Sequence, residues 1–266
     1  MSAPAPSLPS RAQSGQAAVE AALTLPLVVF LFLGTLQLFL LMQGRILAQY
    51  ALSRAARAGS LNHGSCRSMQ HAAIAALLPS FHSFLAPTYL GGGSNARKYV
   101  EAFRERSNNR FRPTLDNGHD GSIIWLYRER PLQGVVFSGW WEEDYDLPSS
   151  ARAPSTSAPL MLELRMIYWF PLRIPFANWV WNRMVAAHFG LASYRYSNPL
   201  MLAERDANWD AAAARARLDA PVAEELMRLA NATPRPQYSL PIEVTYVTRM
   251  MTPPRAAEFQ QQDCPR

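Results

Sequence analysis

An unbroken apolar segment near the N-terminus constrains this chain more than any other feature. Residues Ala21–Met42 contain no charged residue, and their only polar residues are Thr24, Thr35 and Gln37. As a helix rising about 1.5 Å per residue, the segment is about 33 Å long, enough to cross a hydrocarbon core of about 30 Å. A cleaved secretory signal has a shorter apolar stretch, and a buried core helix rarely stays uncharged for so long. The sequence therefore predicts one transmembrane helix in a lipid bilayer.

The helical pattern continues beyond this span. Residues 43–58 contain no proline, and small or apolar residues recur there at three- and four-residue spacing, namely Ile46, Leu47, Tyr50, Ala51, Ala55 and Ala58. We expect the helix to leave the membrane as an amphipathic stalk that ends near Gly59. The apolar stripe of this stalk needs a partner.

A short polar leader containing Arg11 precedes the span, and it ends in the sequence SGQAAVE at residues 14–20. Gly15 is followed five residues later by Glu20. A carboxylate at the edge of an apolar helix is costly once other helices pack around it, unless an opposite charge is supplied. The alternative is that Glu20 is a solvated flank of the helix, since this Gly–Glu spacing is common.

The similarity to a known pattern extends well beyond this spacing. The run GQAAVEAALTLPLVVFLFLGTLQL includes Pro26, Gly34 and Gln37, and AARAG follows at residues 55–59. Together they resemble the N-terminal segment of TadE-like pilus-assembly proteins, minor pseudopilins of the tight-adherence (Flp) type IV pilus machinery. The resemblance covers about residues 11–60, with a weaker similarity at residues 160–176. Ala21 departs from it, because many family members carry an aromatic residue there.

The resemblance implies that residues 1–15 are a prepilin-like leader. A membrane prepilin peptidase would cut after Gly15 and leave Gln16 as the new N-terminus, although major type IV pilins usually begin with Phe at this position. Glu20 would then act in assembly by meeting the Gln16 ammonium of a neighbouring subunit. The implied partners are other pilins and pseudopilins, the inner-membrane pilus platform and the prepilin peptidase. The implied role is structural, with no catalytic residue and no cofactor.

Orientation is predicted differently by two features. Arg45, Arg54 and Arg57 follow the span and Arg11 alone precedes it, so the positive-inside rule would place the C-terminus in the cytoplasm. The leader indicates the opposite, and we give it precedence. We expect a single-pass protein of the bacterial inner membrane, with a helix at residues 16–58 and a periplasmic head at residues 59–266. The rival hypothesis is a membrane-tethered periplasmic enzyme or binding protein whose leader is similar by accident.

Cys66 and Cys264 are the two cysteines of the chain, and neither lies in a C-x-x-C pair. This excludes a zinc ribbon and a thioredoxin motif. In an exported domain one even pair is compatible with a disulfide, and two unpaired, partly buried thiols are the alternative. The tail around Cys264, QQQDCPR, has no apolar anchor, so we expect its order to depend on the bridge.

The head is predicted to be α+β with a small antiparallel sheet. Two segments alternate with period two, residues 160–170 and 240–250, and they are the best candidate strands. Shorter strands are expected at residues 122–128 and 134–137. Expected helices lie at residues 66–78 (stopped by Pro79), 96–107 (capped by Asn95), 179–188, 207–218 and 222–229 (capped by Asp219).

Other candidate chemistry is weak. The net charge is +6, but Lys98 is the one lysine and the charges are scattered, which argues against nucleic-acid binding. Residues 116–121 lack the ligand pattern of a calcium loop and are expected to form a turn, and the acidic run at residues 142–146 is expected to be a solvated loop. His63, Cys66 and His71 match no metal-site spacing, so no metal is predicted. The aromatic residues at 168–181 are interpreted as core, with a membrane-interface belt as the alternative.

Overall fold

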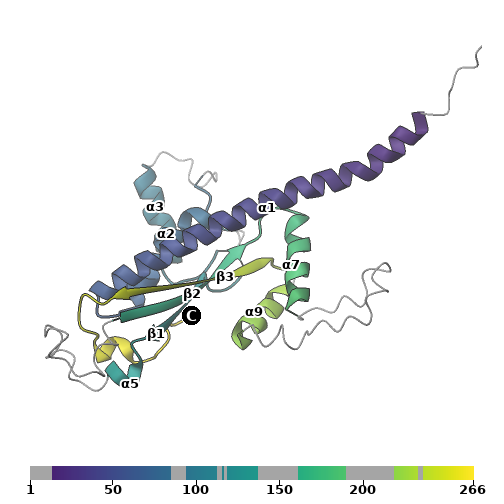
Figure 1. Cartoon of the computed structure of the whole chain (residues 1–266). Helices are drawn as coiled ribbons and strands as arrows, with labels where there is room; N and C mark the ends of the chain where they lie inside the picture. The colour runs from purple at the N-terminus through teal and green to yellow at the C-terminus, as the bar shows by residue number, and fades with distance from the viewer. Residues whose placement is uncertain are drawn as a thin grey trace, which may run out of the picture.

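The structure is a computed structural model that describes residues 14–84, 94–112, 116, 119–136, 161–189, 219–232 and 236–266. Its dominant element is the helix α1, Ser14–Leu61, which continues without interruption through Pro26. At about 1.5 Å per residue, its 48 residues span about 70 Å. Figure 1 shows the C-terminal half of α1 lying across the head and the N-terminal half projecting from it.

Three antiparallel strands form the sheet, in the order β1–β2–β3. Their bounds are β1, Ile124–Arg130; β2, Met161–Pro171; and β3, Ser239–Arg249. Tyr168 in the central strand pairs with Ile124 on one side and Ile242 on the other. The expected fold class, α+β with a small antiparallel sheet, is confirmed, and both long strands lie within one residue of their expected positions.

Alternation along β2 sends its side chains to two different layers, because successive residues of a strand point to opposite faces. On one face lie α1 and α2, Cys66–Phe81, which both pack against the sheet. The residues of β2 that face this layer are all buried: Leu162, Leu164, Met166, Tyr168 and Phe170. On the opposite face, Trp169 contacts Trp125, with ring centroids 5.1 Å apart. The core therefore lies mainly between the sheet and the two helices.

Helix α2 ends at Phe81, two residues beyond Pro79, where it was expected to stop. Proline has no backbone N–H, so the carbonyl of Ala75 loses its intrahelical partner. The hydroxyl of Tyr99 donates a hydrogen bond to that carbonyl. Tyr99 belongs to α3, Asn95–Arg106, whose N-cap is Ser94 rather than the expected Asn95; the Ser94 hydroxyl oxygen accepts from the backbone N–H of Arg97 at 3.3 Å.

The prediction of a strand at residues 134–137 is wrong. Residues Gln133–Val136 form the short helix α5, which packs against the single-turn helix η5, Ala256–Phe259. The side-chain oxygen of Gln262 in the C-terminal tail accepts the N–H of Gln133 at 2.6 Å. A short apolar run does not distinguish helix from strand by periodicity alone. Here a tertiary contact with the tail decides the outcome.

Two further helices complete the described head. Helix α7, Ala177–His188, contacts α1, and α9, Ala220–Ala230, contacts β3. Asp219 occupies the expected N-cap position of α9 but makes no capping hydrogen bond, because its carboxylate lies 2.6 Å from Nη1 of Arg165. The helix expected at residues 207–218 and the loop at residues 142–159 lie outside the described residues.

Candidate functional site

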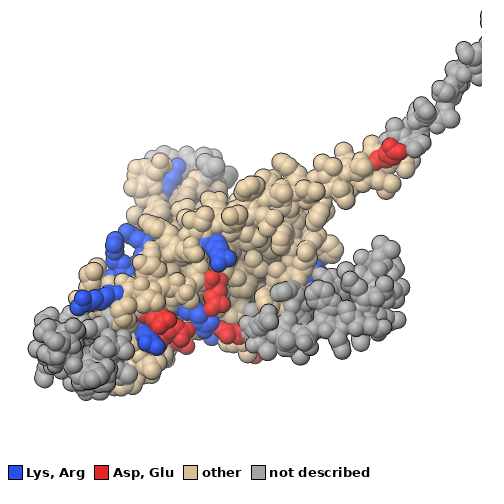
Figure 2. All heavy atoms as spheres, viewed as in Figure 1, with Lys and Arg blue, Asp and Glu red and all other residues tan. Residues whose placement is uncertain are grey.

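The projecting half of α1 presents an apolar surface to its surroundings. Every residue from Ala18 to Phe32 is exposed, and this stretch contains one charged residue, Glu20. Figure 2 shows almost no basic or acidic atoms on this half of the helix, in contrast to the head. Among the described residues, one helical stretch, Ala18–Leu61, is long and apolar enough to cross a membrane. Its apolar part is not a core helix, because the head does not bury it.

The residues predicted to act in processing lie at the beginning of this helix. Gly15 and Gln16 are in the first turn of α1, and residues 1–13 of the predicted leader are outside the described part of the chain. The first four N–H groups of a helix have no intrahelical partner, so this turn can open at low cost. Glu20 lies one turn further on and is exposed. The hydroxyl of Thr24 donates to the backbone carbonyl of Glu20 at 2.8 Å.

Gln37 marks the point where α1 meets the head. Its side chain is fully buried, and its Oε1 accepts the backbone N–H of Ile174 at 3.1 Å. Ile174 lies in the link between β2 and α7. The one amide in the apolar span is thus used to satisfy a backbone donor of the head. This hydrogen bond fixes the position of the head along the axis of α1.

Beyond Gln37, small residues form the face of α1 that packs on the head. The face consists of Gly44, Ala48, Ala51, Ala55, Ala56 and Gly59, all buried. A Cβ added at Gly44 would lie 2.6 Å from the ring of Phe170, and one at Gly59 would lie 2.5 Å from the sulfur of Met69. The backbone of α1 therefore approaches the sheet and α2 more closely than larger residues would permit.

This packing corrects the apolar stripe expected for the stalk. Ala51 and Ala55 are buried as expected, but Ile46 and Tyr50 are 63% and 51% exposed. The buried face is centred on the small residues instead, because they allow the close approach. Residues 44–60 are therefore part of the core of the head, and they are not a free stalk between the head and the span.

A disulfide joins Cys66, the first residue of α2, to Cys264 in the C-terminal tail. The backbone N–H of Cys264 also donates to the carbonyl of Leu126 in β1 at 3.1 Å. The bridge encloses a chain separation of 198 residues and holds the end of the chain beside the base of α1. The structure thus brings together the two cysteines that the sequence left open as a pair or as free thiols.

The C-terminal tail makes further buried contacts besides the bridge. Phe259, just before QQQDCPR, is fully buried, and the guanidinium of Arg128 lies 4.0 Å from its ring centroid. Arg128 donates to four carbonyl oxygens, those of Gly64, Glu258, Gln261 and Gln262. Burial lowers the pKa of Arg128 to about 10, although Asp263 and Glu258 oppose the shift. These carbonyls replace the water that a buried guanidinium loses.

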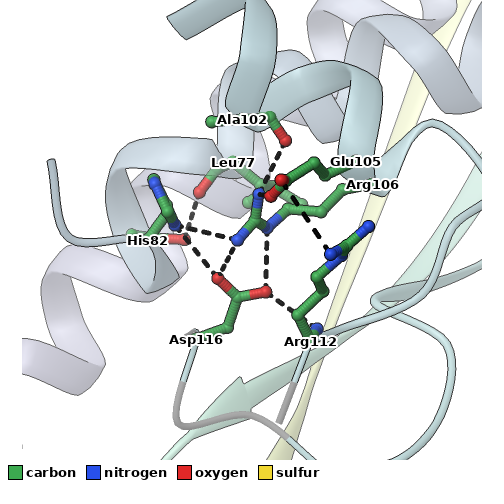
Figure 3. Close-up of polar contacts among 8 residues, drawn as sticks. Leu77, His82, Ala102, Glu105, Arg106, Arg112 and Asp116 are labelled. Atoms are coloured by element: carbon green, nitrogen blue, oxygen red, sulfur yellow. Dashed lines mark hydrogen bonds and ion pairs between the residues drawn. The ribbon is translucent and has the colours of Figure 1, made fainter. Parts of the chain in front are cut away.

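A second buried cluster joins α3 to Asp116 (Figure 3). The guanidinium of Arg106 bonds to both carboxylate oxygens of Asp116, with Nε–Oδ2 at 2.8 Å and Nη2–Oδ1 at 2.5 Å. Nδ1 of His82 lies 3.1 Å from Oδ1 of Asp116, and the N–H of Arg112 donates to Oδ2 at 2.9 Å. Burial alone raises the pKa of Asp116. The hydrogen bonds from His82, Arg106 and Arg112 and the charge of Arg106 outweigh this effect and lower the pKa.

This cluster has the features of a structural ion pair. Both charged side chains are fully buried, and the pair is bidentate, the geometry that best offsets desolvation. Asp116, which was expected to begin a turn, is helical and contributes a carboxylate to the core. Among the described residues, no group of three or more His, Cys, Asp or Glu is placed to hold a metal ion.

His119 is a buried histidine on the other face of the sheet. Its ring packs between Phe111 and Trp169, with centroid separations of 5.1 and 5.6 Å, and its Nε2 lies 3.5 Å from Oε1 of Glu225. Burial lowers the pKa of His119 to about 4; the charge of Glu225 opposes the shift without reversing it. His119 is therefore neutral at physiological pH.

Several of these residues were missed or left without a role by sequence reasoning. Arg106 and Arg128 lie among 26 basic residues, and nothing in their local sequence marks them as buried. For Gln37 a signal was present, since an amide in an otherwise apolar helix needs a hydrogen-bond partner. The predicted aromatic core is half correct, because Tyr168, Trp169 and Phe170 are buried while Phe176 and Trp179 are exposed.

Comparison with known proteins gives one finding. Residues 15–57 match the family described as TadE-like protein. The match begins at Gly15, includes Glu20, Gln37 and Gly44, and ends within the small-residue face of α1. Neither the curated proteins nor the solved structures contain a significant match to the chain.

Proposed function

We propose, from the TadE-like segment at residues 15–57, that this chain is a minor pseudopilin that takes part in assembly of a tight-adherence type IV pilus. Its helix spans the bacterial inner membrane once, and its head lies in the periplasm. The observation that carries the proposal is the division of α1 at Gln37. The helix exposes an apolar surface with one carboxylate before this residue and is built into the head after it.

This division suits a subunit that assembles through its helix. The exposed apolar half packs among lipids in the isolated protein and among the helices of other pilins and pseudopilins in the assembled state. The half docked on the sheet fixes the direction in which the helix leaves the head. The inner-membrane pilus platform is the proposed site where such helices are brought together. The role is structural, and it uses no cofactor.

Processing after Gly15 supplies the charge that assembly needs. A prepilin peptidase removes residues 1–15, and Gln16 becomes an N-terminal ammonium. Glu20 lies four residues later, about 6 Å along the helix axis. When helices pack in the membrane, the Glu20 carboxylate needs a counter-charge, and the ammonium of a neighbouring subunit provides it. Pairing of these groups between subunits would set the axial stagger of neighbouring helices.

The periplasmic placement of the head is supported by the bridge between Cys66 and Cys264. Disulfides persist in oxidising compartments such as the periplasm and are rare in the cytosol. The arginines that follow the span, Arg45, Arg54 and Arg57, are exposed and favour the opposite orientation, and we give the bridge precedence over them.

Substitution of Glu20 tests this function. The variant E20L should insert into the membrane and keep a folded head, because Glu20 lies outside the head's core. It should lose co-purification with partner pilins in the native host, since the Gln16 ammonium then has no counter-charge. The measurement is recovery of partner pilins with the tagged full chain, together with piliation of the cells.

Two matched variants sharpen this experiment. E20D keeps the charge and should retain partner recovery, whereas E20Q keeps the size without the charge and should fail like E20L. Wild-type piliation and partner recovery in E20L would show that Glu20 is only a solvated flank of the helix.

A further inference from the structure

Helix α7 and the residue before it carry an exposed apolar face. Phe176, Trp179 and Met184 are 75%, 52% and 53% exposed. Phe176 and Trp179, three residues apart, define this face; Arg183 lies one turn beyond Trp179, and Met184 lies on the side of α7 that carries Ala177 and Trp181. The opposite side packs inward, with Ala177 fully buried and Trp181 against the core. Trp179 also lines a groove between α7 and α9, with Leu226 and Met227 on its other wall, whereas Phe176 lies outside this groove.

This face lies at the level where α1 leaves the head. The backbone N–H of Ile174, two residues before Phe176, donates to Gln37 of α1, and α7 contacts α1 directly. In Figure 1, α7 extends from α1 on the side of the head from which the projecting half emerges. Strand β2 ends on the same side at Pro171, and β3 begins there at Ser239; these two residues pair with each other.

The length of α1 shows what lies at this level when the helix spans a membrane. The apolar run begins at Ala21, and the head first encloses α1 at Gln37. Sixteen residues at about 1.5 Å each give about 24 Å, less than the hydrocarbon thickness of about 30 Å. About four further residues, 37–40, are needed to cross it. The contact between Gln37 and Ile174 therefore falls about 6 Å inside the edge of the hydrocarbon core, and Phe176 and Trp179 follow it closely in the chain.

The backbone at this position also holds Phe176 outward. Phe176 has φ of +65°, in the left-handed region that a bulky residue rarely adopts. Such a conformation costs on the order of 1–3 kcal/mol and persists only where its surroundings enforce it. Here the conformation directs an aromatic side chain into the surroundings rather than into the core, which lies next to it at Ala177.

We propose that this face of α7 docks on the lipid bilayer that α1 spans. Phe176 enters the edge of the hydrocarbon region, and Trp179 occupies the interface where tryptophan is favoured. The head is then held at two points, by α1 through the membrane and by α7 on its surface. This fixes the tilt of the head, and it requires only that α1 spans the membrane, not that the protein acts in a pilus.

Photocrosslinking of the full chain in native membranes tests the proposal. A benzophenone amino acid is introduced at Phe176 or Trp179, and Met251 serves as the matched control. Met251 is 65% exposed, and its N–H bonds to Ser60 at the other end of the docked helix, about 35 Å along α1 from Gln37. After irradiation, adducts are identified by mass spectrometry in cells with and without the other pilus proteins.

The proposal predicts phospholipid adducts at positions 176 and 179 in both strains, at least tenfold above those at position 251. Equal, low lipid adducts at all three positions would overturn it. So would adducts at position 176 that are mainly to another protein or to another part of this chain. Because the strain without pilus proteins is included, loss of the lipid adduct is distinguishable from failure of the pilus assignment.

Discussion

At the scale of single residues, buried polar side chains determine how this head is assembled. Gln37 attaches α1 to the link before α7, Arg128 collects four carbonyls of the C-terminal tail and the turn after α1, and Arg106 binds Asp116. Gln37 and Arg128 contact residues that are distant in sequence, and Arg106 contacts Asp116, ten residues further along the chain. Such side chains are costly to bury without partners, so they specify one arrangement of the surrounding segments.

His119 is the residue whose protonation should control stability in mild acid. Its folded-state pKa is about 4, below the ordinary value of 6.5. Between these values the unfolded chain binds a proton that the folded chain does not, so stability decreases as the pH falls from about 6.5 to about 4. The shift corresponds to about 3 kcal/mol in the free energy of unfolding. Denaturant unfolding of the detergent-solubilised chain at pH 7.5 and pH 4.5 measures most of it.

The variant H119L should lose most of this pH dependence, whatever its stability at pH 7.5. H71L is the control, because His71 is only partly buried, and it should keep the wild-type dependence. Asp116 and Glu225 also have lowered pKa values. Their contribution to stability is lost mainly when the pH falls below their ordinary pKa values of 3.8 and 4.5. A wild-type stability that is flat between pH 7.5 and 4.5 would contradict the assignment.

At the scale of elements, α1 projects from the head in its N-terminal half and packs on the head in its C-terminal half. Glycine is essential only in the packed half. Gly44 and Gly59 lie where the sheet and α2 approach the backbone, whereas an added Cβ at Gly34 would meet nothing within 4 Å. Gly34, Gly44 and Gly59 thus differ in what surrounds them, and the same substitution at each position can be compared directly.

Substitution by valine should separate these environments. G44V should lower the free energy of unfolding by about 1–3 kcal/mol, because the buried ring of Phe170 has little room to move. G59V should cost less, because the flexible end of Met69 is able to shift. G34V should leave the head's unfolding transition unchanged. Thermal unfolding of the three full-length variants in one detergent measures the order, and equal losses at positions 34 and 44 would contradict the close packing.

Prediction from sequence succeeded where periodicity is local and failed where a distant contact decides. The long apolar helix and strands β2 and β3 were predicted to within a few residues, because burial of one face imposes a regular pattern. Helix α2 passes Pro79 because Tyr99 supplies a donor to Ala75, and α5 is helical because Gln262 caps it. The aromatic segment at residues 168–181 was divided between core and surface by the turn at Phe176, which its composition did not indicate.

At the scale of the whole molecule, the chain closes on itself at the base of α1. Met251 and Thr252 bond to Ser60, Arg255 bonds to His63, and Cys264 is bridged to Cys66. The C-terminal tail thus covers the turn that follows α1. Protein extracted from its native host without reductant should show no alkylation of either cysteine, and full labelling of both would contradict the bridge and the periplasmic placement.

Removal of the bridge in C66A/C264A should destabilise the head without releasing the tail. A bridge over 198 residues contributes about 5 kcal/mol in the chain-entropy model. Arg128 and Phe259 should still hold the tail, so hydrogen exchange at residue 264 should remain slow under native conditions. R128L, with the bridge intact, should speed exchange at residues 258–262. Rapid exchange of the whole tail in C66A/C264A would show that the bridge is its only anchor.

The N-terminal residue of the mature protein shows whether the chain is processed as a pilin is. The full chain is expressed with an active prepilin peptidase of its own host, and with an inactive peptidase as the control, and its N-terminus is sequenced after purification from membranes. We expect the active enzyme to leave Gln16 as the first residue, and we expect G15R to abolish this cleavage while the chain still inserts. Recovery of Met1 or Ser2 from the wild-type chain in the presence of active peptidase would contradict the assignment as a pseudopilin.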